Sequence, residues 1–117
     1  MLKLNEDTRI FVADKPVDCR KAINGLVSLV IEQFEQPVND GSVYVFYNGS
    51  CDRVKCLFWD KNGFVLYHKR LERGRFKMKK TADGAYVISQ NQLDWLLAGL
   101  DFQLMNEFKT LDFTQYF

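Results

Sequence analysis

Hydrophobic and polar positions follow two periods along this chain, and each period predicts a different kind of element. Apolar residues recur three or four positions apart over Cys19–Phe34, the spacing of an amphipathic helix. Leucines recur with the same spacing over Ser89–Ala98, where Gln92 stands three residues after Ser89 as in a capping box. We therefore expect two amphipathic helices, with Asp18 as the N-cap of the first and Gly99 as the C-cap of the second.

Short runs rich in β-branched and aromatic residues predict strands. In chain order these runs are Thr8–Ala13, Ser42–Tyr47, Arg53–Trp59, Phe64–Lys69 and Ala85–Ile88. The turn sequences Asn48-Gly49 and DKNG join the three central runs into a three-stranded antiparallel meander. The predicted fold is α+β, with an antiparallel sheet of four to five strands packed against the two helices.

The two faces of this meander differ in chemistry, because side chains alternate across a strand. Val54, Cys56 and Phe58 share one face of the middle strand, while the opposite face carries a mixture of basic and apolar residues that includes Lys55 and Trp59. One face is suited to pack on a helix, and the mixed face suits binding. The alternative is a sheet that helices or a partner chain cover on both faces.

Charge is concentrated in the segment Lys69–Lys80, which reads KRLERGRFKMKK. Seven basic residues and one glutamate give this segment a formal charge of +6, and because the whole chain carries +1 the remaining residues sum to −5. Segregated positive charge favours a surface for a polyanion or an acidic partner. A solvated basic loop is the alternative.

Arginine offers bidentate contacts to phosphate or guanine edges, lysine acts as a point charge, and aromatic faces stack on bases. The expected nucleic-acid-binding residues are Arg20, Lys21, Arg53, Lys55, Lys69, Arg70, Arg73, Arg75, Lys77, Lys79 and Lys80, and the expected stacking residues are Trp59, Tyr67 and Phe76. In the alternative interpretation the arginines pair with carboxylates of the chain itself, namely Asp18, Asp52, Asp60 or Glu72.

The sequence offers little for catalysis or for a bound metal. A zinc site would need all four of the available soft ligands to converge. Those ligands are Cys19, Cys51, Cys56 and His68. The chain lacks a glycine-rich phosphate loop and a recognisable nucleophile motif, so we expect no catalytic residue, no metal and no other cofactor. A metal-dependent nuclease would require Asp52, Asp60 and Glu72 to approach one another.

The length of 117 residues fits one domain, and a hydrophobic content of 47% is enough for a packed core. We expect this domain over residues 1–102, followed by an apolar tail over residues 103–117 that docks on the domain or on a second subunit. No apolar run approaches the roughly 20 residues that span a bilayer, and the N-terminus lacks the apolar region of a secretory signal. A cytoplasmic protein without membrane contact is therefore expected.

Several separated motifs occur in the order of a known family. These motifs are DTRIFVA, PVDCRKAINGL, VFYNGSCDRVKCLFWDKNGFVLYHKRLERGRF and ISQNQLDWLLAGLDF. Over about Thr8 to Phe102 they resemble the small TnpB accessory protein of bacterial insertion sequences of family sixty-six, which is distinct from the RNA-guided nuclease that shares the name TnpB.

The resemblance implies a non-enzymatic accessory role in transposition, beside a separate and larger transposase. Together with the basic segment it suggests DNA binding, with the ends of the element as the expected target. An adaptor that contacts the transposase is the alternative, and a metal-dependent nuclease is a third hypothesis. We also expect that the chain can form a homo-oligomer through its C-terminal tail.

Overall fold

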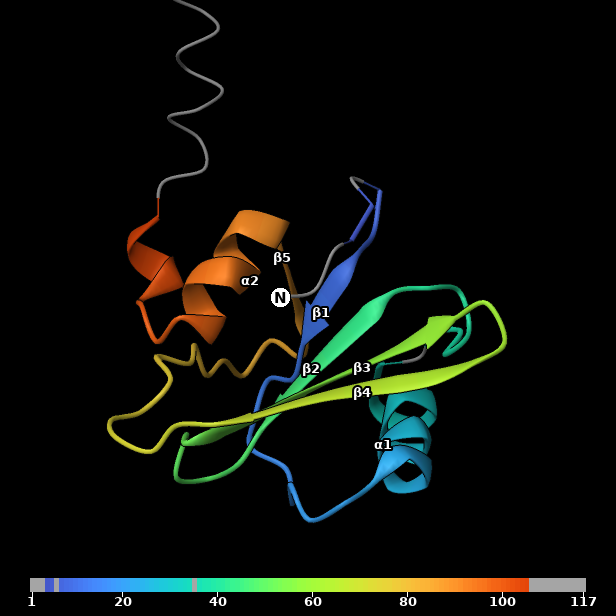
Figure 1. Cartoon of the computed structure of the whole chain (residues 1–117), viewed down its shortest axis with the longest axis horizontal. Coiled ribbons are helices and arrows are strands. Elements are labelled where there is room, and N and C mark those ends of the chain that lie inside the picture. Colours follow the sequence, from blue (N-terminus) through green and yellow to red (C-terminus); the bar gives the residue numbers. More distant parts are fainter. Residues whose placement is uncertain (1–3, 6, 35, 106–117) are drawn as a thin grey trace, which may run out of the picture.

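One five-stranded sheet organises the chain in the computed structural model, which describes residues 4–5, 7–34 and 36–105 (Figure 1). The strands are β1 (Ile10–Val12), β2 (Val43–Tyr47), β3 (Arg53–Asp60), β4 (Gly63–Arg70) and β5 (Tyr86–Ile88). They lie in the order β4-β3-β2-β1-β5, and only the β1–β2 pair is parallel. The predicted α+β fold and its central meander are confirmed. Residues 106–117 of the predicted apolar tail lie outside the described residues.

The central strand β2 is buried along its whole length, which requires cover on both faces of the sheet. Helix α1 (Ile23–Leu29) lies beside the β3–β4 end of the sheet, and helix α2 (Gln90–Leu97) lies beside β5 (Figure 1). The structure therefore follows the alternative in which helices cover both faces. Helix α1 covers part of the mixed aromatic and basic face of the meander, while His68 and Arg70 on the edge strand β4 stay exposed on that face.

The first helix is shorter than the predicted Cys19–Phe34, and Asp18 does not cap it. Its N-cap is Ala22, which provides no side-chain hydrogen bond. The Asp18 carboxylate instead accepts hydrogen bonds from the backbone N–H and the guanidinium of Arg20, while Cys19 turns into the core. This competing local hydrogen bonding delays the start of the helix.

A π-helical turn, η1 (Val30–Phe34), follows α1 and changes which side chains face the core. Phe34 packs edge-on against Tyr44 and Phe46, with ring centroids 5.2 and 5.6 Å apart. Ile31, which the α-helical period placed on the apolar side, is 59% exposed. The wider turn therefore brings Phe34 inward and leaves Ile31 outside.

The end of α2 satisfies all four of its terminal carbonyl groups. The Ser89–Gln92 capping box is present at its start, as predicted. Gly99 follows the helix with a φ of +82°, and the N–H groups of Gly99 and Leu100 bond the carbonyls of Leu96 and Trp95 as in a Schellman motif. Ala98 bonds the Asp94 carbonyl. The remaining carbonyl, at Leu97, accepts a hydrogen bond from Lys69 Nζ at 2.7 Å. A short 3-10 helix, η2 (Phe102–Leu104), ends the described chain.

Two lysines of the β3–β4 hairpin hold the two helices to opposite faces of the sheet. Lys55 pairs with His68 across the hairpin, and Lys69 occupies the next position of β4, so the two ammonium groups point to opposite faces. Lys55 Nζ donates to the carbonyl of Lys21, just before α1, at 2.8 Å. Lys69 Nζ donates to the carbonyl of Leu97, the last residue of α2. Both lysines are therefore structural residues.

We predict that Lys55→Met and Lys69→Met each lower the free energy of unfolding by about 1–3 kcal/mol, because each leaves a carbonyl without a charge-assisted partner. Lys77→Met is the matched control, since Lys77 is exposed and makes no polar contact with the described residues. It should stay within about 0.5 kcal/mol of the parent chain. Urea unfolding measures all three variants. Equal stability of the Lys55 variant and the control would contradict the structural role.

Candidate nucleic-acid interface

The segment that carries most of the positive charge follows β4 and is fixed to the sheet at its beginning. The Leu71 N–H donates to the Asp52 carbonyl at 2.8 Å, and the Phe76 N–H donates to the Cys51 carbonyl at 2.7 Å. The Phe76 side chain is 2% exposed and belongs to the core. The segment is therefore held in one place although it forms no strand.

Side chains alternate along this segment. Phe76 and Met78 pack toward the core, while Arg75, Lys77 and Lys79 are exposed between and beside them. Such alternation is typical of extended backbone. Because each residue rises about 3.3 Å, side chains two residues apart on the same side are separated by about 6.6 Å. The result is a row of outward-facing cations on one side of the segment.

Four exposed cations between residues 73 and 80 have no partner among the residues that the structure describes. Arg73, Arg75, Lys77 and Lys80 are exposed and form neither a hydrogen bond nor an ion pair there through their side chains. Lys79 differs, because its ammonium group lies 5.2 Å from the centre of the Tyr86 ring. We call residues 73–80 the outer loop, and its exposed cations are Arg73, Arg75, Lys77, Lys79 and Lys80.

Two arginines of the expected set pair with neighbouring carboxylates. Arg70 Nε lies 2.9 Å from Glu72, and an Arg20 guanidinium nitrogen lies 2.9 Å from Asp18. Hydrogen bonds from Arg20 lower the pKa of Asp18 to about 2. All four side chains are largely exposed, so these pairs contribute little to stability. Some arginines of the expected set are thus paired with carboxylates, whereas others, Arg73 and Arg75, are exposed and unpaired within the described ranges.

The remaining basic residues gather on the face of the hairpin that α1 covers. Arg53 lies opposite Arg70 and Lys55 opposite His68, so these four side chains share that face. Lys21 is exposed, and its carbonyl holds Lys55. His68, which the sequence suggested as a possible zinc ligand, joins this cluster through the strand register. Burial, followed by the charges of Lys55, Arg53 and Arg70, lowers its pKa.

None of the three expected stacking residues presents its ring on the exposed side of the outer loop. Phe76 lies in the core. Trp59 packs edge-on against Phe64 at the far end of the hairpin, with ring centroids 4.9 Å apart. Tyr67 is half-buried opposite Cys56, on the other face of the hairpin from His68. Contacts to bases are therefore not prepared at the outer loop by these rings.

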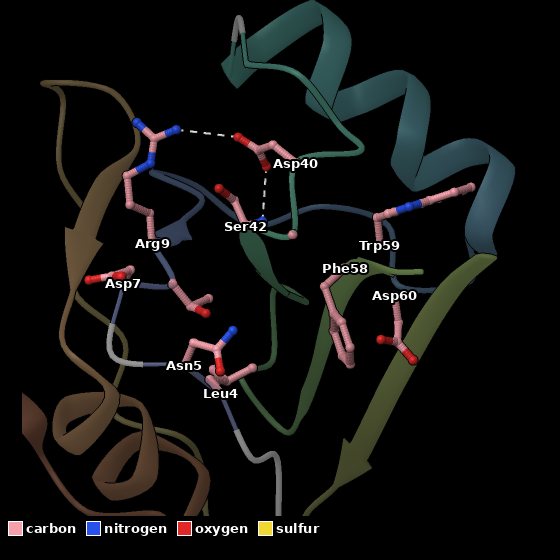
Figure 2. A pocket seen from close by; sticks show the side chains of 11 residues that line it. Leu4, Asn5, Asp7, Arg9, Asp40, Ser42, Phe58, Trp59 and Asp60 are labelled. Carbon is pink, nitrogen blue, oxygen red and sulfur yellow. Dashed lines mark hydrogen bonds and ion pairs between the residues drawn. The ribbon is translucent and has the colours of Figure 1, made fainter. Parts of the chain in front are cut away.

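A cavity of about 680 Å³ lies at the end of the sheet away from the outer loop (Figure 2). Trp59 and Asp60 line one side of it, and Arg9 lines another together with its ion-pair partner Asp40 at 3.3 Å. Asp40 also accepts the Ser42 N–H at 2.9 Å. Arg9 is therefore already paired with Asp40, and two further carboxylates that line this cavity, Asp7 and Asp60, make its lining acidic.

The carboxylates of the nuclease hypothesis do not gather. Asp52 and Asp60 flank opposite ends of β3, so about 26 Å separates them at roughly 3.3 Å per residue. Within residues 4–5, 7–34 and 36–105, no three His, Cys, Asp or Glu side chains lie close enough together to hold a metal ion. Among those same residues no helix has the length and apolar character to cross a membrane.

Comparison with known proteins identifies relatives over most of the chain. The family model described as IS66 Orf2 like protein matches residues 8–107. Two uncharacterized proteins of Sinorhizobium fredii are similar: y4jC is 40% identical over 101 residues, covering 86% of each chain, and y4hO is 34% identical over 103 residues, covering 88% of this chain and 90% of the relative. No solved structure matches the chain significantly.

Proposed function

We propose that this chain, which belongs to the IS66 Orf2-like family, assists transposition of its insertion sequence by binding DNA through the outer loop. The observation that carries the proposal is the set of exposed cations without partners, Arg73, Arg75, Lys77 and Lys80, on a segment that Phe76 fixes to the core. Like charges held side by side repel one another, and a polyanion removes that repulsion.

Fixing the loop in advance favours binding, because fewer side chains and less backbone must be ordered when the partner arrives. The loop is tied at Leu71 and Phe76, and Tyr86 Oη donates to the Lys79 carbonyl at 2.9 Å near its other end. The cations therefore extend from a fixed backbone. A phosphate backbone, with regularly spaced charges, is the partner that matches a row of cations best.

The contacts we propose are with phosphates rather than with base edges. Reading bases in the major groove usually requires a helix or a two-stranded ribbon that carries polar side chains into the groove. Neither α1 nor α2 contains a basic residue, and α1 lies against the β3–β4 ribbon and partly covers the face that carries its arginines. Phosphate contacts position a protein on DNA without selecting a sequence. Sequence choice at the ends of the element then belongs to another component, such as the transposase.

We predict a salt dependence that counts the contacts of the outer loop. Arg75→Gln and Lys77→Gln should each weaken binding and reduce the slope of log affinity against log salt by about 0.9 on duplex DNA, or about 0.7 on a single strand, because each removes one released counterion. Fluorescence anisotropy with a labelled random-sequence duplex and the matching single strand, over a salt series, measures both slopes.

Lys61→Asn is the matched control for this experiment. Lys61 is exposed at the β3–β4 turn, far from the outer loop along the hairpin, and its φ of +53° suits asparagine. The substitution changes net charge by the same single unit. Its affinity and slope should equal those of the parent chain. Equal losses in the control and in Arg75→Gln would show a net-charge effect and refute a contact at the loop.

A separate observation favours a second function, contact with the transposase. Trp95, Leu100 and Leu104 are 38%, 50% and 78% exposed, and all lie near the end of α2 and in η2. Large exposed apolar side chains that lie close together mark protein interfaces more often than single ones do. This region consists of other residues than the outer loop, and we propose that the transposase and DNA bind to these two different sets of side chains.

The adaptor function predicts co-purification of this chain with the element's transposase after nuclease treatment has removed DNA. Leu100→Gln combined with Leu104→Gln should abolish co-purification while leaving DNA binding intact, because neither residue is in the core. Arg75→Gln should leave it unchanged. Retention of the transposase by the double leucine variant would refute this surface as the contact.

A further inference from the structure

We infer that Arg53, His68 and Arg70 form a second anion site, on the α1 face of the β3–β4 hairpin, that takes one phosphodiester group of the bound DNA. The inference rests on the proposed function, because it adds a contact for the same polyanion. It arises from a different part of the structure, however. The outer loop supplies cations from an extended segment, whereas this site is built by strand register.

The register places like charges directly opposite each other. Arg53 pairs with Arg70 across the hairpin, and the neighbouring pair on the same face is Lys55 with His68. Opposite positions bring Cβ atoms to about 5 Å, where like charges destabilise a sheet. Lys55 is engaged by the Lys21 carbonyl and Arg70 by Glu72. The Arg53 guanidinium has neither kind of partner among the described residues.

Arg53 is also incompletely hydrogen-bonded where water is excluded. Its Nε atom is buried and has no hydrogen-bond partner in the described part of the chain. The nearest acidic residue in sequence, Asp52, accepts a hydrogen bond from the Asn48 amide at 2.6 Å instead of pairing with Arg53. Buried donors are rarely left unsatisfied, and a water molecule or an ion commonly completes the hydrogen bonding of such an atom. A tetrahedral oxyanion accepts hydrogen bonds from guanidinium groups in bidentate fashion.

His68 lies where it would sense this anion. The charged groups that act on it are Lys55 and Arg53 on β3 and Arg70 on its own strand, and all are basic. The carboxylates beside these arginines are engaged, since Glu72 pairs with Arg70 and Asp52 accepts a hydrogen bond from Asn48. The His68 side chain is exposed, so the site is open to a ligand. A bound anion would stabilise the imidazolium, and by linkage anion affinity would rise as pH falls through the pKa of His68.

The site lies next to the outer loop. The hydrogen bonds from Leu71 to Asp52 and from Phe76 to Cys51 hold the start of the loop against the residues just before Arg53. The cations of the loop and the Arg53 site therefore meet at one end of the hairpin. A DNA strand that crosses this end contacts both.

The chain contains a single histidine, so nuclear magnetic resonance reports on this site without ambiguity. The imidazole ring protons of His68 are titrated with pH in the intact chain, in sodium chloride and in sodium sulfate at equal ionic strength. Sulfate is a tetrahedral oxyanion that does not itself titrate between pH 5 and 8. We expect the pKa to be higher in sulfate by on the order of one pH unit, as for an opposite charge within about 6 Å.

Variants separate the site from general screening. Arg53→Gln should abolish the rise that sulfate causes, and Arg75→Gln, which alters the outer loop, should keep it. Arg70→Gln is a second test should Arg53→Gln fail to fold, because Arg70 is largely exposed and its loss should also reduce the rise. An identical His68 pKa in sulfate and in chloride would overturn the site.

A parallel titration with a saturating short duplex separates this inference from the proposed function. DNA binding detected by anisotropy, with a rise in the His68 pKa that Arg53→Gln removes, supports both. DNA binding with an unchanged pKa overturns the site and leaves the proposed function intact. A rise in sulfate without any DNA binding supports an anion site and refutes the proposed function.

Discussion

The two inward hydrogen bonds of Lys55 and Lys69 constrain the rest of this structure. They come from neighbouring positions of one hairpin, point to opposite faces, and end on carbonyls at the start of α1 and the end of α2. With a helix on each face every residue of the central strand β2 is buried, while the edge strand β4 keeps exposed positions such as His68 and Arg70. Lysine is almost never buried without a partner, so each ammonium group must find a carbonyl. The ammonium groups of these two residues are therefore engaged within the fold.

The remaining positive charge is presented by a segment with a different design. In the outer loop, Phe76 and Met78 are packed against the core while the cations between them face outward. The apolar residues fix the backbone, and the basic residues supply the charge. This arrangement needs no helix and no pocket, which agrees with a role in contacting a phosphate backbone. It differs from the cavity lined by Arg9 and Asp40, where Arg9 is ion-paired and the lining also carries the carboxylates of Asp7 and Asp60.

The sequence predicted the fold better than the site. Alternation and turn residues identified every strand, and the Ser89 capping box and Gly99 gave the bounds of α2, because these signals are local. The π-turn at Val30–Phe34 was not predictable, since it depends on how Phe34 packs between Tyr44 and Phe46. The inward direction of Lys55 and Lys69 was missed for a similar reason. Their partners, at Lys21 and Leu97, come within reach only through the tertiary fold, and a count of charges does not reveal them.

The account separates lysines that are hydrogen-bonded within the fold from lysines that are exposed. The most direct test is the rate at which each lysine is acylated, measured by mass spectrometry with and without duplex DNA. The account predicts slow reaction at Lys55 and Lys69 in both states, because their ammonium groups are hydrogen-bonded inside the fold. It predicts fast reaction at Lys77 and Lys80 that DNA suppresses, and fast reaction at Lys61 that DNA leaves unchanged. Fast acylation of Lys55 in the folded chain, or equal protection of Lys61 and Lys77 by DNA, would contradict it.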